Sequence, residues 1–145
     1  MSMKQTIARV SSYPADVFGA CSALFELGGM IVIHDPSGCN STYATHDEPR
    51  WYDMDSLFFI SGLTEMDAVM GNDNKLVHDI VSAAQDLSPR FIAVLQSPIP
   101  YMIGTDLEAV AKLVQKKTEI MTFALPTNSM HSYVKGASMA FAMLA

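Results

Sequence analysis

Residues 91–98 read Phe91-Ile92-Ala93-Val94-Leu95-Gln96-Ser97-Pro98. Five consecutive apolar residues predict a strand that is covered on both faces, as the strands of a parallel sheet are. The polar residues and the proline that follow predict a turn at the end of this strand. The stretch therefore predicts a unit in which a buried strand is followed by a polar turn.

The same unit recurs on both sides of this stretch. Thr105 and Glu108 are spaced as a capping box, which predicts a helix that ends at the basic pair Lys116-Lys117. Apolar runs predict further strands at residues 30–33, 57–60 and 120–125, and a short strand at 68–70. Helical spacing predicts helices at residues 16–27, 72–87 and 131–144. In the last of these helices the residues expected to face inward are Val134, Ala137, Ser138 and Phe141.

Buried strands that alternate with amphipathic helices indicate an α/β fold. We expect a three-layer, Rossmann-like, mostly parallel sheet with helices on both faces, joined by right-handed crossovers. A length of 145 residues, without repeats or a linker, predicts a single domain over residues 1–145.

Composition excludes several classes of function. The chain carries 9 basic and 15 acidic residues and has no basic cluster, which argues against nucleic-acid binding. No apolar run reaches the roughly 18 residues that a membrane span needs. The first ten residues lack the apolar core of a signal peptide, so we expect a cytoplasmic protein with reduced thiols. Half of the residues are apolar, which fits either a large core or a partner interface, and an oligomer is expected.

Ligands of such sheets bind beyond the carboxyl ends of the strands. Cys39 follows a strand and Gly38, in a loop whose backbone amides can point at a sulfur or an anion. Thiolates are the usual ligands of iron–sulfur clusters. One cysteine cannot hold a cluster alone, and on the residues alone an inert thiol is the simpler interpretation. Cys21, at a core position of a helix, is interpreted as a small buried hydrophobe.

Other candidate ligands surround Cys39 in the sequence. His34 and Asp35 precede it, and His46, Asp47 and Glu48 follow, but their spacing fits no standard zinc site. Residues 50–52, an arginine and two aromatic residues, suit either an interface anchor or a packed lid. The chain has no nucleophile elbow, no phosphate loop with Gly-Lys-Ser/Thr and no dinucleotide-binding glycine motif.

Residues 34–39, His34-Asp35-Pro36-Ser37-Gly38-Cys39, resemble the His-Gly-Pro-x-Gly-Cys motif of the nitrogenase component 1-type oxidoreductases. Residues 61–76, 97–107 and 127–136 are similar to three further motifs of this family and follow in the family's order. The resemblance covers the chain from about Tyr13 to its end. It implies that residues 1–145 are the first domain of a longer subunit, with the substrate site mainly outside this domain.

The resemblance also implies a redox role. Such a domain would receive electrons from an ATP-dependent iron–sulfur reductase and pass them through a cluster at a subunit interface. Cys39 stands at the position of a family cluster ligand, which makes Gly38 and Ser97 candidate cofactor-binding residues, and His34 and Asp35 candidate metal ligands beside Cys39.

The chain departs from the family at several positions. Tyr13 and Ser97 or Pro98 stand where the family has its other two cysteines, and Asp35 replaces a glycine. The departures favour a smaller cluster, shared by Cys39 of each subunit in a homo- or hetero-oligomer, or no cluster. Two alternatives to the electron relay therefore stay open. One is a non-catalytic scaffold for metallocluster assembly, and the other is a cluster-free oligomeric α/β binding domain.

Overall fold

The computed structural model of the chain describes residues 15–36, 40 and 57–145. These residues form a parallel sheet of four strands in the order β2-β1-β3-β4. In this sheet Met30 pairs with Leu57 on one side and with Ile92 on the other. The strands are β1 (Met30–His34), β2 (Leu57–Ile60), β3 (Ile92–Gln96) and β4 (Thr122–Leu125).

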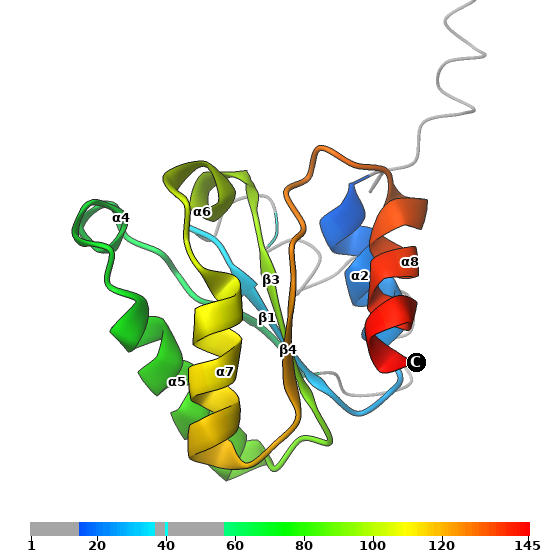
Figure 1. The fold of residues 1–145 in the computed structure, drawn as a ribbon, viewed down its shortest axis with the longest axis horizontal. Helices are drawn as coiled ribbons and strands as arrows, with labels where there is room; N and C mark the ends of the chain where they lie inside the picture. Colours follow the sequence, from blue (N-terminus) through cyan, green and yellow to red (C-terminus); the bar gives the residue numbers. More distant parts are fainter. Residues whose placement is uncertain (1–14, 37–39, 41–56) are drawn as a thin grey trace, which may run out of the picture.

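Helices cover both faces of the sheet, which confirms the predicted three-layer α/β fold (Figure 1). One face is covered by α2 (Asp16–Leu24) and α8 (Tyr133–Leu144), and the other by α5 (Asp73–Leu87) and α7 (Leu107–Thr118). Two short helices, α4 (Glu65–Met70) and α6 (Pro98–Ile103), lie at the carboxyl ends of the strands (Figure 1). No helix in the described ranges is long and apolar enough to cross a bilayer.

The sheet separates two apolar cores, because successive residues of a strand point to opposite faces. Ile31 and Ile33 of β1 pack in the core beneath α2 and α8. Met30 and Val32 pack in the core beneath α5 and α7. The continuous apolar runs seen in the sequence are therefore explained by burial on both faces.

The helices α2 and α8 approach each other closely at two glycines. A Cβ atom on Gly136 would overlap the backbone carbonyl of Asp16, and one on Gly19 would overlap the backbone carbonyl of Tyr133. Only glycine allows such backbone contact, so these two residues fix how α8 lies on α2.

This close contact overturns the expected inward face of α8. The buried residues are Gly136 and Ala140, whereas Val134 is 75% exposed and Phe141 is 59% exposed. Ser138 is also exposed, and Ala137 is half-buried. Helical spacing of the larger apolar residues indicated the wrong face because the interface with α2 admits only small side chains.

Two other local predictions were wrong. Residues 68–70 belong to α4 rather than to a strand, because Thr64 and Asp67 form a capping box that starts a helix there. The helix α7 is capped by Asp106, whose Oδ1 accepts the N–H of Ala109 at 3.0 Å, and not by Thr105. The predicted capping box at Thr105 thus stood one residue too early.

Candidate functional site at the carboxyl edge of the sheet

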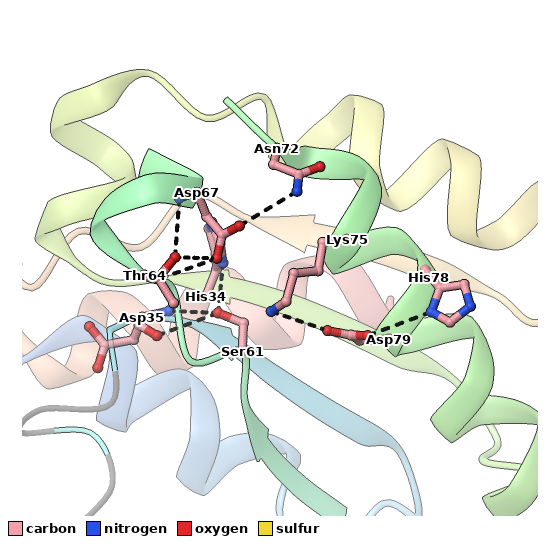
Figure 2. A network of polar contacts seen from close by, with 9 residues as sticks. All are labelled: His34, Asp35, Ser61, Thr64, Asp67, Asn72, Lys75, His78 and Asp79. Carbon is pink, nitrogen blue, oxygen red and sulfur yellow. Dashed lines mark hydrogen bonds and ion pairs between the residues drawn. The ribbon is translucent and has the colours of Figure 1, made fainter. Parts of the chain in front are cut away.

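The site begins where β1 ends, because the side chains of His34 and Asp35 leave the strand toward different faces. The ring nitrogen Nδ1 of His34 lies 2.7 Å from Oγ of Ser61, in the turn after β2 (Figure 2). The same hydroxyl accepts the backbone N–H of Asp35 at 3.2 Å. Ser61 therefore joins the ends of two neighbouring strands.

Burial favours the neutral form of the His34 imidazole. Burial lowers its pKa from the ordinary value of 6.5, and the nearby carboxylates of Asp73, Asp35 and Asp67 offset this effect only in part. Its side chain is 4% exposed, so it lies against β2 and the start of α5 rather than in solvent.

A polar network next to His34 caps both ends of α4 (Figure 2). Oδ2 of Asp67 accepts the hydroxyl of Thr64 at 2.6 Å and its backbone N–H at 3.3 Å. Nδ2 of Asn72 donates to Oδ1 of the same carboxylate at 3.5 Å. The hydrogen bond from the Thr64 side chain is the main reason that the pKa of Asp67 is lowered. The network is a helix cap, and its groups satisfy one another.

On the other side of the strand ends lies a hollow of about 400 Å³, named here the Asp35–Ser97 hollow. Asp35 and Ser97, which follow β1 and β3, both line it, and both are almost fully buried. The remaining lining is mostly apolar and consists of Ala15, Phe18, Pro36, Asn40, Pro98, Ile99 and Ser129.

Two oxygen atoms of the residues that line this hollow have no hydrogen-bond partner within the described part of the chain. They are Oδ2 of Asp35 and Oγ of Ser97. A buried polar atom without a partner costs free energy, and such atoms commonly mark the place of a bound group. Oxygen donors suit hard metal ions, whereas thiolates suit iron–sulfur clusters. Two unpartnered oxygens in residues that line one hollow make this hollow the best candidate for a binding site at the carboxyl edge of the sheet.

The structure brings only some of the predicted site residues together. Asp35 and Ser97 share a hollow, whereas His34 lines smaller hollows beside α5 with Asp67 and Asn72. Gly38 and Cys39 lie outside the described residues, as do residues 46–48 and 50–52. Within the described ranges, no group of three or more His, Cys, Asp or Glu side chains could hold a metal ion.

Cys21 takes no part in the site. It is fully buried in the core beneath α2 and α8, and burial raises the pKa of its thiol far above the usual range. The interpretation of Cys21 as a small buried hydrophobe is confirmed.

Two contacts that shape the edge were not predicted from the sequence. The carboxylate of Asp16 is fully buried and accepts the backbone N–H groups of Asn128 at 3.2 Å and Ser129 at 2.8 Å. Oγ1 of Thr127 accepts the N–H of Gln96 at 3.1 Å and donates to its carbonyl at 2.9 Å. Both contacts tie the loop after β4 to distant segments, and in the sequence Asp16 signalled only the start of a helix.

A parallel, helix-covered sheet with a hollow beyond its carboxyl ends defines the class of Rossmann-like α/β domains. Residues 16–145 match the model of the family described as Nitrogenase component 1 type Oxidoreductase, and the chain belongs to this family. The resemblance of residues 34–39 and of the three later motifs is thereby confirmed at the level of the family.

Two solved structures share the fold. "Nitrogenase Cp1 at pH 5" has 22% sequence identity and a TM-score of 0.72, and the match covers 93% of this chain and 30% of that chain. "Nitrogenase Cp1 at pH 6.5" has 22% identity and a TM-score of 0.70, with coverage of 93% and 28%. This chain therefore spans less than a third of the length of either structure. A sequence search of curated proteins gives no significant match.

Proposed function

We propose that this chain is a domain of a redox subunit that relays electrons through an iron–sulfur cluster held in the Asp35–Ser97 hollow. The main support is that Asp35 and Ser97 line the same hollow, and that Oδ2 of Asp35 and Oγ of Ser97 are buried without hydrogen-bond partners among the described residues. Members of this family typically bind iron–sulfur clusters. A bound cluster would supply the one-electron chemistry that no described side chain provides.

Cys39 is the proposed thiolate ligand. Pro36 and Asn40, which bracket residues 37–39 in the sequence, both line the hollow. Cys39 directly precedes Asn40 in the sequence, and this adjacency supports its assignment to the hollow. In this proposal Cys39 supplies the sulfur, Ser97 and Asp35 supply oxygen, and Gly38 gives the backbone room to approach the cluster.

The hollow's own residues would do three things. The Ser97 hydroxyl and the Asp35 carboxylate would bind and orient the cluster. The apolar side chains of Phe18 and Ile99 would exclude water from it. A low-dielectric surrounding of this kind sets the potential at which a cluster accepts an electron.

One thiolate and two oxygens from one chain are too few for a cluster of several irons. We therefore infer that a related subunit contributes the remaining ligands, in a homo- or hetero-oligomer that shares the cluster.

We further propose that the chain is the first domain of a longer cytoplasmic subunit. The match covers 30% and 28% of the two solved chains, which supports a longer subunit.

An exposed apolar surface at the same edge is the proposed docking site of an ATP-dependent iron–sulfur reductase. None of the residues of α4 is buried, and Met66, Val69 and Met70 are each at least 70% exposed. Met102 of α6 is 77% exposed. Exposed apolar residues commonly mark an interface, and α6, whose Pro98 and Ile99 line the hollow, would bring a donor close to it.

Reduction of the reconstituted protein by a reductase of this type tests the relay. We expect reduction that requires both the reductase and ATP, and at least a tenfold slower rate in Met70→Glu and Met102→Glu. Met121→Glu is the matched control, because Met121 is 52% exposed and directly precedes β4, at the opposite end of the sheet. Equal rates in all three variants, or reduction that is independent of ATP, would contradict the relay.

The oxygen donors also favour a second candidate function. Serine and aspartate oxygens hold iron–sulfur clusters less firmly than thiolates, which suits a scaffold that binds a metallocluster and transfers it. Transfer of iron from the loaded protein to an apo-acceptor, without any ATP-driven reduction, would select the scaffold over the relay.

A further inference from the structure

A second hollow, named here the Gln96 hollow, lies on the α7 side of the sheet and has a volume of about 240 Å³. Gln96, at the end of β3, and Pro126, after β4, line it from the sheet. Thr105, Asp106 and Glu108, around the start of α7, line it from the helix. None of these residues belongs to the Asp35–Ser97 hollow.

Gln96, which lines this hollow, has a side-chain oxygen that accepts no hydrogen bond from the described residues. Gln96 is only 6% exposed, and its Oε1 atom is buried with no hydrogen-bond partner among the described residues. Its backbone N–H and carbonyl both hydrogen-bond to Oγ1 of Thr127, which fixes the end of the strand beside the hollow. A buried amide oxygen in this position favours a ligand that donates hydrogen bonds.

The charge around the hollow favours a cation. Asp106 uses Oδ1 to cap α7, and its carboxylate lies at the rim of the hollow. Glu108 faces Lys112 at 3.8 Å, but both side chains are 79% exposed, so solvent screens this pair. The amides of a helix start attract anions, whereas the two carboxylates that line this hollow attract a cation.

We propose that the Gln96 hollow binds a guanidinium or ammonium group, with an N–H donated to Oε1 of Gln96 and the positive charge facing Asp106 and Glu108. Such a group is offered either by a free organic cation or by an arginine or lysine side chain of a partner protein. Because the site lies next to α6, a side chain of a protein that docks on α6 could reach it.

Titration of the ¹⁵N-labelled full chain with guanidinium at subdenaturing concentration tests the site, with urea as the matched neutral probe. Urea has nearly the same planar shape and donors as guanidinium but no charge. We expect saturable resonance shifts at Thr105, Asp106 and the Gln96 side-chain amide with guanidinium and not with urea. Sodium chloride at the same ionic strength should not reproduce these shifts.

Two variants separate the site from a folding defect. Gln96→Leu should weaken guanidinium binding about tenfold, because one charge-assisted hydrogen bond is lost. Glu108→Gln, at an exposed position that folding tolerates, should weaken it by roughly two- to threefold. Unchanged affinity in both folded variants, or equal shifts with urea, would overturn the proposal.

The same measurement distinguishes the two sources of the cation. An arginine peptide with apolar flanking residues that binds more tightly than argininamide would assign the site to a partner side chain. Equal affinity of the two would assign it to a free cation. A peptide with citrulline in place of arginine has no positive charge, and it should bind neither the parent protein nor the two variants. If the parent protein bound the citrulline peptide as tightly as the arginine peptide, the requirement for a positive charge would be contradicted.

Discussion

The backbone N–H of Ser129 donates to Oδ1 of Asp16 at 2.8 Å, across 113 residues of sequence. Asp16 is fully buried, and its carboxylate also accepts the N–H groups of Asn128 and Val17. Ser129 has a positive φ of 60° and lines the Asp35–Ser97 hollow. The first residue of α2 therefore fixes the loop after β4 in the shape that closes one wall of the hollow.

Replacing Asp16 should cost the protein much of its stability. In Asp16→Ala the three backbone donors lose their acceptor, and we expect a loss of about 3 kcal/mol in the free energy of unfolding. Denaturant unfolding followed by circular dichroism measures it. Asp86→Asn, at an exposed position of α5, is the control and should change stability by less than about 0.5 kcal/mol. A loss as small as that of the control would show that the buried carboxylate is not needed.

Adding one methyl group at the α2–α8 contact should also destabilise the fold. Gly136→Ala would gain about 1 kcal/mol in helix propensity at an exposed site, but here its Cβ overlaps the carbonyl of Asp16. We expect a net loss of roughly 1–3 kcal/mol in thermal or denaturant unfolding. Ser138→Ala, at an exposed position of the same helix, should be neutral or slightly stabilising. A more stable Gly136→Ala would disprove the close contact.

The buried imidazole of His34 should make stability depend on pH. Its pKa in the folded protein is lowered by burial below 6.5, so below pH 6.5 the unfolded chain binds more protons than the folded chain. The free energy of unfolding should therefore rise with pH up to this value and level off above it. In His34→Gln this part of the slope should disappear, and it should persist in His78→Gln, whose imidazole is 83% exposed. Identical slopes in parent and His34→Gln would refute the assignment.

The two thiols should differ in reactivity. Cys21 is fully buried and the pKa of its thiol is raised by burial, so the reactive thiolate is scarce and inaccessible. In Cys39→Ala we expect no reaction with a thiol reagent in the native state and reaction of one thiol after denaturation. Rapid labelling of native Cys39→Ala would show that the core around α2 opens readily.

Sequence patterns predicted the layers of this fold because a strand that is buried on both faces is an uninterrupted run of apolar residues. The runs at residues 30–33 and 91–95 are apolar without interruption, and they became the two central strands. Predictions failed where small residues or a single side chain decided the outcome. Gly136 determines which face of α8 packs against α2, because the two backbones touch there. The hydroxyl of Thr64 caps α4 and so determines where this helix begins.

Half of the candidate site was within reach of the same reasoning. Asp35 and Ser97 could be paired in advance, because parallel strands deliver the residues that follow them to one edge. The divergence of His34 from Asp35 follows from strand alternation but was not drawn from the sequence. The role of Asp16 could not be foreseen, because a contact across more than a hundred residues leaves no local pattern.

Anaerobic reconstitution with iron and sulfide decides whether Cys39 holds a cluster, with bound iron and visible absorbance measured in the parent, Cys39→Ala and Cys21→Ala. We expect a stable brown protein from the parent and from Cys21→Ala, and little bound iron in Cys39→Ala. The same iron content and spectrum in Cys39→Ala as in the parent would contradict a cluster at this edge of the sheet, as would a parent that binds no iron.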